Sequence, residues 1–239
     1  MWSRLWLQWP IQRSMFVFLL VGAVMGSTAC GIAISPKRTP TEVSIAMVTS
    51  LPQPRTEGLF SLEESLLRRR SVREFSSDLL SSSEISQLLW SAQGITDPRG
   101  FRTAPSAGAL YPLELYVLTQ KGVFHYDVQA HALNTLIEGD LRQDLYQAAL
   151  NQEAILQAPL TIIITAIYAR TEVKYGKARS PRYVHMEAGH AAQNILLQAV
   201  SLNLGAVPIG AFEDNRIQTV LGLPADHEPL YLIPVGYPR

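Results

Sequence analysis

The sequence predicts an α+β domain, because hairpin strands and long helices follow one another without regular β-α-β alternation. Residues 113–119 alternate, a turn follows, and residues 123–128 continue the pattern, which predicts a β-hairpin. The apolar run at 161–169 (TIIITAIYA) predicts a strand in the centre of the sheet. The longest helical pattern covers 184–204 and is apolar on several faces, so we expect this helix in the middle of the domain.

Helix start and stop signals place the remaining elements. Ser61 and Ser81 each begin a Ser-x-x-Glu capping pattern, in which side chains bond the free N–H groups of a helix start. The first predicts a short helix that runs into the arginines at 68–70, and the second a helix that stops at Gly94. The other expected elements are a helix over 140–151, strands over 206–212 and 230–235, and a helix between these strands from Asp214 to Gly222.

Composition excludes several classes of protein. The 239 residues include 20 basic and 20 acidic side chains, and this balance argues against nucleic-acid binding, which needs a net basic face. Hydrophobic residues make up 47%, enough for a real core. The single cysteine, Cys30, excludes an intramolecular disulfide, a CxxC redox pair and a Cys-rich zinc site. Redox chemistry would therefore need a cofactor. The sequence contains neither GxGxxG nor a P-loop, so a nucleotide would not be bound in the Rossmann or Walker manner.

The N-terminal segment has the layout of an export signal. Arg4 and Arg13 precede an unbroken apolar run at 15–25, and small residues lead to Cys30, as at the end of a bacterial lipobox. Ser27 departs from that pattern, where an aliphatic residue is usual. An uncleaved transmembrane anchor is the alternative, since no charged residue interrupts this stretch.

We therefore expect three parts in the chain. Residues 1–30 form a signal, lipoprotein-like or anchor segment, with Cys30 as the candidate lipidation site. Residues 31–58, rich in Pro, Thr and Ser, form a flexible tether. Residues 59–239 form the folded domain. The expected location is a membrane, with the domain exported and anchored through its N-terminus; an anchor on the cytoplasmic face remains open.

Four segments could carry chemistry. Residues 68–75 (RRRSVREF) combine guanidinium groups with a serine hydroxyl, which suit a phosphate. The loop 104–109 (APSAGA) and the segment 205–212 (GAVPIGAF) let backbone approach a flat ligand closely. Residues 174–183 are basic and aromatic, and we expect them in a loop after the central strand. Each also has an ordinary structural explanation: a solvated charge run, a common loop, an edge strand or a solvated surface.

Together and in this order, the segments resemble the FMN-dependent nitroreductase superfamily, and specifically its SagB/ThcOx-type dehydrogenase branch, which includes the azoline oxidases of peptide-toxin maturation. The motifs that carry the resemblance are RRSVREF (69–75), PSAGALYP (105–112), KYG with RYVHMEAGHAAQN (174–194), VPIGAF (207–212) and LIPVGYP (232–238). The resemblance covers about 59–239. It implies a central, mainly antiparallel sheet flanked by helices, with FMN at a homodimer interface.

The first motif, by its position in the family, implies contacts with the FMN phosphate and the pyrimidine edge. Arg69 and Ser71 would hold the phosphate, with Arg70 beside them, and Arg73 would lie at the N1/O2 edge, where a cation stabilises reduced flavin. Many members close over the phosphate with a basic tail. This chain stops at Arg239, so we expect that arginine to supply the charge alone or the phosphate to be held more weakly.

Two further motifs imply contacts with the flavin ring. The expected contacts are Pro105, Ser106 and Ala107 from the partner subunit, Pro208 and Ile209 over one ring face, and the backbone amides of Gly210 and Ala211 at N5 and O4. Many nitroreductases have an acidic residue where Gly210 stands and an amide side chain where Ala109 stands. Those side-chain contacts are lost here, which leaves backbone only.

Lys174 and Tyr175 resemble the proton-abstracting pair of azoline oxidases. A lysine can act as a base only where burial or neighbouring cations favour its neutral form. The leading hypothesis is an FMN oxidoreductase of SagB type, in which one of the pair takes a proton from a small or peptide substrate and flavin takes the hydride. The alternatives are an NAD(P)H-dependent nitro- or quinone-reductase and a non-enzymatic, membrane-tethered flavin- or partner-binding protein. No metal is expected, because His185 and His190 are not four residues apart as in HExxH sites.

Overall fold

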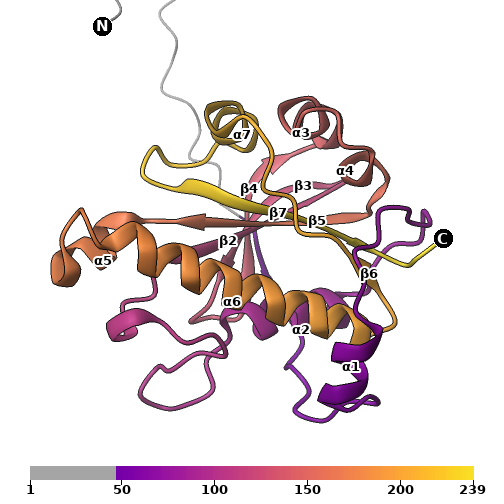
Figure 1. Ribbon diagram of the computed structural model, residues 1–239. Helices are drawn as coiled ribbons and strands as arrows, with labels where there is room; N and C mark the ends of the chain where they lie inside the picture. The colour runs from indigo at the N-terminus through magenta and orange to yellow at the C-terminus, as the bar shows by residue number, and fades with distance from the viewer. Residues whose placement is uncertain (1–46) are drawn as a thin grey trace, which may run out of the picture. The chain divides into compact units, whose positions relative to one another are not determined.

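The computed structural model describes residues 47–239, so the predicted leader, Cys30 and residues 31–46 of the predicted tether lie outside the described residues. Seven strands form one sheet in the order β1-β4-β3-β2-β5-β7-β6, and every pair of neighbouring strands is antiparallel (Figure 1). The strands are β1 (Val48–Ser50), β2 (Leu113–Thr119), β3 (Gly122–Asp127), β4 (Ala132–Glu138), β5 (Leu160–Ala166), β6 (Gly205–Ala206) and β7 (Glu228–Gly236). The α+β class and the antiparallel sheet are confirmed.

Helices cover both faces of the sheet. On one side lie α3, α4 and α7, and on the other side α6 and α2 (Figure 1). The helices are α1 (Leu62–Arg68), α2 (Ser82–Gln93), α3 (Arg142–Ala148), α4 (Glu153–Gln157), α5 (Tyr168–Tyr175), α6 (Ser180–Ser201) and α7 (Asp214–Leu221), with a 3₁₀ turn at Ala107–Ala109. None of the helices within 47–239 is both long and apolar enough to span a bilayer.

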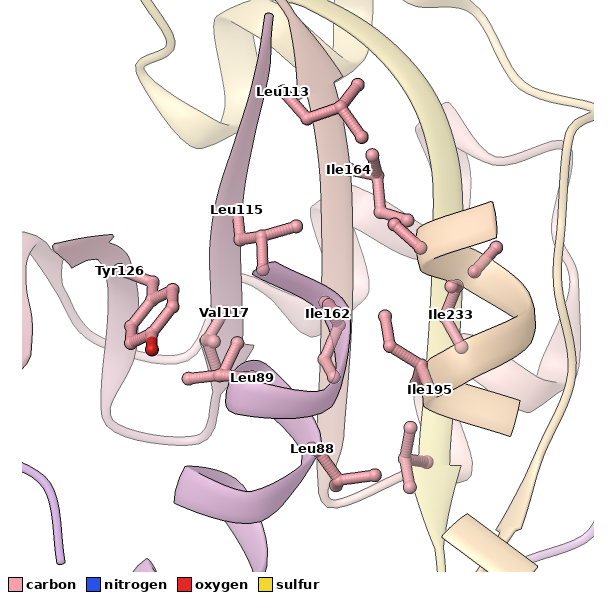
Figure 2. Close-up of a cluster of buried hydrophobic side chains, with 14 of the residues drawn as sticks. Leu88, Leu89, Leu113, Leu115, Val117, Tyr126, Ile162, Ile164, Ile195 and Ile233 are labelled. Atoms are coloured by element: carbon pink, nitrogen blue, oxygen red, sulfur yellow. The ribbon is translucent and has the colours of Figure 1, made fainter. Parts of the chain in front are cut away.

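Alternation along the strands builds two hydrophobic cores. Leu115 and Val117 of β2 pack with Leu88 of α2 and Ile195 of α6 in the first core (Figure 2). The intervening Tyr116 and Leu118 face the second core, which contains residues of α3, α4 and α7. The central strand β5 contributes to both cores and is buried along its whole length, which explains its unbroken apolar sequence.

Most predicted elements are confirmed, with shifted ends. Ser81 and Glu84 form the complete capping box of α2, whereas Ser61 caps α1 through the Glu64 N–H alone. The strand expected over 161–169 ends earlier, because α5 begins at Tyr168. The strand expected over 206–212 is regular only at Gly205–Ala206, since Pro208 has no N–H to continue the ladder.

The folded chain begins earlier than Leu59, where the sequence analysis places its start. Strand β1 lies within the predicted tether, yet it pairs with β4 at the edge of the sheet. Leu51 after it is buried, and the carbonyl of Pro52 accepts the Ser86 hydroxyl at 2.5 Å. His131 bonds the same hydroxyl at 2.7 Å. These contacts attach residues 48–52 to α2. The strand was not predicted because only three of its residues are paired, which leaves little periodic signal in a Pro-rich segment.

Candidate functional site

The arginine motif lies where α1 meets β6. Arg69 ends α1, and the guanidinium of Arg70 donates to the carbonyl oxygens of Leu67 and Arg69 at 3.1 and 2.7 Å. Ser71 then bridges to Ala206 of β6, so the motif is held by backbone pairing while Ser71 and Arg73 stay exposed. Exposed guanidinium groups at the carboxyl end of a helix suit the helix dipole and leave donors free for an anion.

The chain end returns to this motif. Pro238 bridges to Phe75, and the Arg239 N–H donates to the Glu74 carbonyl at 3.2 Å. The structure therefore brings Arg239 beside the segment that contains Arg73. A cavity of about 200 Å³ lies here, lined among others by Arg70 and Val72 and by residues 203–206.

The segment after β6 presents free backbone amides. The Ile209 N–H donates to Leu232 at 2.8 Å, and its side chain is buried. Gly210 and Ala211 are exposed, and within residues 47–239 their N–H groups donate no hydrogen bond. An ideal Cβ on Gly210 would meet no atom within 4 Å. Open space, two free amides and nearby guanidinium groups form a donor set that fits a flat, phosphorylated cofactor such as FMN.

The second half of the candidate site joins the 105–109 loop to Lys174 and Tyr175. Gly108 has a positive φ of 65°, and an ideal Cβ there would lie 3.0 Å from Lys174 Nζ and 3.1 Å from Tyr175 Oη. Tyr175 also packs on Tyr183 of α6, with ring centroids 4.5 Å apart. The loop, the end of α5 and the first turns of α6 therefore form one cluster.

The location of the Lys-Tyr pair corrects an expectation. The pair was expected in a loop, but it occupies the last turn of α5, which Gly176 ends with a φ of 72°. The helix is short and starts without a side-chain cap, so neither periodicity nor a capping motif revealed it. Lys174 is exposed and Tyr175 half-buried, so the Lys174 ammonium is not desolvated by the chain itself.

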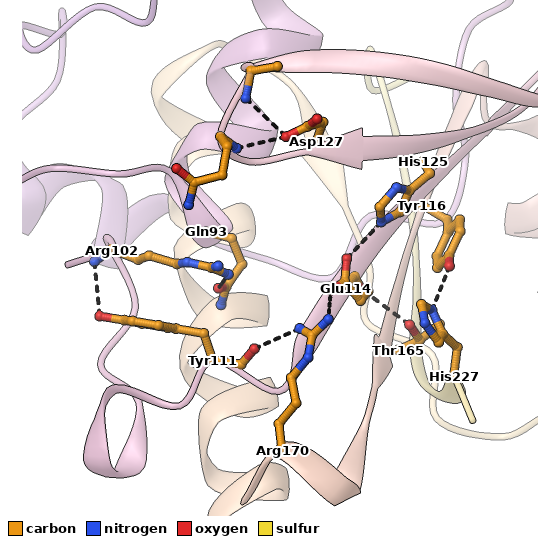
Figure 3. Close-up of polar contacts among 12 residues, drawn as sticks. Gln93, Arg102, Tyr111, Glu114, Tyr116, His125, Asp127, Thr165, Arg170 and His227 are labelled. Carbon is orange, nitrogen blue, oxygen red and sulfur yellow. Dashed lines mark hydrogen bonds and ion pairs between the residues drawn. The ribbon is translucent and has the colours of Figure 1, made fainter. Parts of the chain in front are cut away.

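A polar network on both sides of the 105–109 loop in sequence, from Gln93 to Arg170, was not predicted. Arg102 stacks on the Tyr111 ring, 4.4 Å from its centroid, and donates to Gln93 Oε1 at 2.8 Å (Figure 3). Glu114 pairs with Arg170 and with His125, the latter at 2.7 Å. Burial acts to raise the pKa of Glu114, but the bonds from His125 and Arg170 outweigh it, and the net pKa is lowered. The residues are scattered over the sequence, so only the fold brings them together.

Glu187 of α6 was not predicted from the sequence either. It lies inside the motif RYVHMEAGHAAQN, is only 2% exposed, and burial raises its pKa to about 7. Its sequence position gave one signal: it follows Tyr183 by four residues, so the two share a helix face. Within 47–239 no three His, Cys, Asp or Glu side chains gather as metal ligands.

The two halves of the candidate site lie at opposite ends of α6. The Lys-Tyr pair is at the end that carries α5, and the arginine motif is at the end that carries α1 and β6 (Figure 1). Tyr183 contacts the first half and Val200 lines the cavity of the second. These residues are separated along the helix by about 26 Å at 1.5 Å per residue. One chain alone therefore does not bring together all the residues that the sequence predicts for the site.

Comparisons with known proteins identify relatives over most of the described chain. The model of the nitroreductase family matches residues 66–237. The chain is 47% identical over 181 residues to "Putative nitroreductase MJ1384" of Methanocaldococcus jannaschii, covering 73% of this chain and 90% of that protein. It is 25% identical to the trifolitoxin operon protein TfxC of Rhizobium leguminosarum bv. trifolii, covering 72% of this chain and 54% of TfxC.

Solved structures share the fold. A crystal structure of a "putative nitroreductase" from Ralstonia eutropha JMP134 superposes with a TM-score of 0.74 at 30% identity, covering 80% of this chain and 90% of the other. The E. coli microcin synthetase McbBCD complex with truncated pro-MccB17 bound gives a TM-score of 0.63 at 23% identity, covering 79% and 77%. At that identity the likeness concerns the fold alone.

Proposed function

The chain belongs to the nitroreductase family and is an oxidoreductase, and from this premise we propose that it is an FMN-dependent dehydrogenase of the SagB type. The single observation that carries the proposal is the contact of the Gly108 loop with Lys174 and Tyr175. Gly108 belongs to the loop that we expect to contact flavin, so the pair would offer a proton acceptor beside a hydride acceptor. The relative TfxC, whose name associates it with the trifolitoxin operon, supports the same branch.

FMN, when bound, would supply the two-electron acceptor that the side chains of this protein lack. The residues that would hold it are Arg69, Arg70, Ser71, Arg73 and Arg239 at the phosphate and pyrimidine edge, Pro105, Ser106 and Ala107 at the ring, and the segment Pro208, Ile209, Gly210 and Ala211. We infer that Lys174 or Tyr175 takes a proton from the substrate, and FMN, if bound, would be the acceptor for the accompanying hydride. Loss of one proton and one hydride oxidises the substrate by two electrons, as in an azoline that becomes an azole.

The substrate class that we propose is a small molecule or peptide with an azoline-like ring. Lys174 is exposed, so its amine is accessible to a substrate that approaches the 105–109 loop. A base of this kind contributes about 10²- to 10⁴-fold in rate.

A homodimer would complete the site. Because the two halves lie at opposite ends of α6, a twofold axis that sets two α6 helices antiparallel would place the arginine motif of one copy beside the Lys-Tyr pair of the other. The outer face of α6 suits such a contact: Met186 is 50% exposed, and nothing lies within 4 Å of an ideal Cβ on Gly189. Each dimer would then hold two equivalent sites.

The test starts with purified protein and a peptide that contains one thiazoline ring. A yellow protein with FMN absorbance, and conversion of the thiazoline to thiazole, are the expected results. Lys174→Met with Tyr175→Phe should lower the rate by about 10²-fold or more while FMN remains bound. Lys121→Met, at the exposed turn between β2 and β3, is the matched control and should leave the rate unchanged. Unchanged oxidation by the double variant would refute the role of the pair.

Subunit complementation tests the shared site. Arg73→Ala and Lys174→Met are each expected to be inactive as homodimers. When they are mixed and allowed to exchange subunits, half the dimers are mixed and each has one intact site, so about a quarter of the activity returns. Recovery of no activity after verified exchange would show that each site lies within one chain.

An NAD(P)H-dependent nitro- or quinone-reductase is the second candidate. The specific observation in its favour is the 47% identity to a protein named as a nitroreductase. Bleaching of the bound flavin by NADH, with normal rates in the Lys174 and Tyr175 variants, would support this function over the first. Slow or absent bleaching by NADH together with thiazoline oxidation would support the dehydrogenase.

A further inference from the structure

Glu187 is a buried acidic residue that has no role in the proposed reaction. Its carboxyl is 2% exposed and lies among Gln93 of α2, Arg102 and Ser106 of the 105–109 loop, each of which acts to lower its pKa against the effect of burial. A carboxyl is rarely buried this deeply without partners, because its ionised form then loses hydration. The position therefore needs an explanation beyond packing.

The two polar neighbours of Glu187 each keep a hydrogen-bond donor that is not otherwise engaged. Gln93 Oε1 is occupied by Arg102 Nη1 at 2.8 Å, which leaves the Gln93 amide nitrogen as the group available to the carboxyl. Ser106 Oγ accepts the Tyr111 N–H at 2.9 Å, which leaves the hydroxyl hydrogen to donate. Within the described residues, Glu187 Oε1 and Gln93 Nε2 are both buried and neither has a hydrogen-bond partner, and they are complementary as acceptor and donor.

The same carboxyl is connected to the Lys-Tyr pair in two ways. Ser106 is two residues before Gly108, and an ideal Cβ on Gly108 would lie 3.0 Å from Lys174 Nζ and 3.1 Å from Tyr175 Oη. Tyr183, one helical turn before Glu187, packs on the Tyr175 ring. Glu187 therefore joins the loop on one side of the pair to the helix on the other side.

We propose that Glu187 is a positioning residue, whose buried carboxylate binds the Ser106 and Gln93 donors and so holds the 105–109 loop against Lys174 and Tyr175. The proposal deepens the proposed function and rests on it for the role of the pair. The guanidinium of Arg102, which donates to Gln93 Oε1, is the positive charge that favours the carboxylate form of Glu187. Loss of the carboxylate should release the loop without unfolding the sheet.

Amide hydrogen exchange on the protein without added flavin or substrate tests the positioning directly. In Glu187→Gln, peptides that cover 105–111 should exchange about tenfold faster or more, because the Tyr111 N–H and its loop lose their anchor, while peptides from β2 and β5 exchange as before. Glu63→Gln on the exposed face of α1 is the matched control and should change neither. Unchanged exchange at 105–111 in a folded Glu187→Gln protein would overturn the proposal.

A second variant keeps the test decisive if Glu187→Gln does not fold. Glu187→Asp keeps the carboxylate but shortens the side chain by one methylene, which withdraws the acceptor from the loop while the Ser106 hydroxyl still accepts the Tyr111 N–H. It should give the same faster exchange of 105–111. If Glu187→Asp leaves this exchange unchanged, the proposal is wrong.

Activity separates this proposal from the proposed function. For an active dehydrogenase, Glu187→Gln should lower kcat about 10- to 100-fold, with KM and the dissociation constant of FMN each within about twofold, because geometry rather than binding is lost. An unchanged kcat would overturn the positioning role. If the wild-type protein oxidises no thiazoline, the proposed function fails, and the exchange experiment still decides whether Glu187 holds the loop.

Discussion

The titration of Glu187 should be visible in the pH dependence of stability. Burial raises its pKa to about 7 from the ordinary value of 4.5. Between these two values the folded state binds more protons at this site than the unfolded state does, so stability falls as the pH rises. The destabilisation from the ionised carboxylate is absent below pH 4.5 and complete above pH 7. The pKa difference between the folded and unfolded states corresponds to about 3 kcal/mol of folding free energy.

The variant Glu187→Gln isolates this contribution, because other carboxyls titrate identically in both proteins. Charged Arg102 faces the carboxyl, while the other facing groups, Gln93 and Ser106, are neutral. We therefore expect the free energy of unfolding of the variant, relative to wild type, to rise by about 3 kcal/mol between pH 5 and pH 8. For a domain of this size the same difference moves Tm by about 6–12 °C.

Urea unfolding at half-unit steps from pH 5 to pH 8.5, followed by far-UV circular dichroism, measures the difference directly. Glu63→Gln is the control, and its difference from wild type should vary little over the range. A Glu187→Gln difference that stays constant from pH 5 to pH 8 would show that this carboxyl does not titrate near neutrality, and would refute the reasoning.

Three further predictions concern single positions. Gly205→Ala should destabilise the fold by about 1–3 kcal/mol and weaken FMN binding, because the new Cβ would lie 2.6 Å from Val72 Cβ; equal stability by urea unfolding would contradict this. Gly108→Ala should lower kcat with little change in FMN affinity, since a positive φ and contact with Lys174 oppose the methyl group; steady-state kinetics would show an unchanged kcat if this is wrong. Cys30→Ser should abolish labelling by radioactive palmitate in cells, and persistent labelling would exclude lipidation at Cys30.

The main elements could be predicted because their signals are local. The hairpin of β2 and β3 follows from alternation and a turn, the buried β5 from an apolar run, and α2 from a serine-glutamate capping box with Gly94 as its stop. Two of the elements missed from the sequence have little local signal because they are short. Strand β1 has three residues and is stabilised by its pairing with β4, and α4 has five residues without a side-chain cap.

The site was predictable to the extent that its motifs are contiguous. The arginine motif and the Gly210 segment were identified as separate stretches, and the fold joins them through the bridge between Ser71 and Ala206. That bridge connects positions 135 residues apart and leaves no trace in the spacing. Gln93, Arg102 and Glu187 were missed for the same reason, since each reads as an ordinary polar residue of a helix or loop until tertiary structure buries it.

Glu187 also shows why such residues are retained at a cost in stability. An ionised carboxylate at this depth destabilises the fold at neutral pH, and glutamine would relieve most of that penalty. Glutamine, however, presents an amide where, in the arrangement we propose, the Ser106 hydroxyl and the Gln93 amide both donate, so one donor would lose its acceptor. The expected variant is therefore a protein that is more stable at pH 8 and less well ordered at the 105–109 loop. Opposite changes in these two measurements would separate positioning from packing, because a residue that only filled space would change both in the same direction.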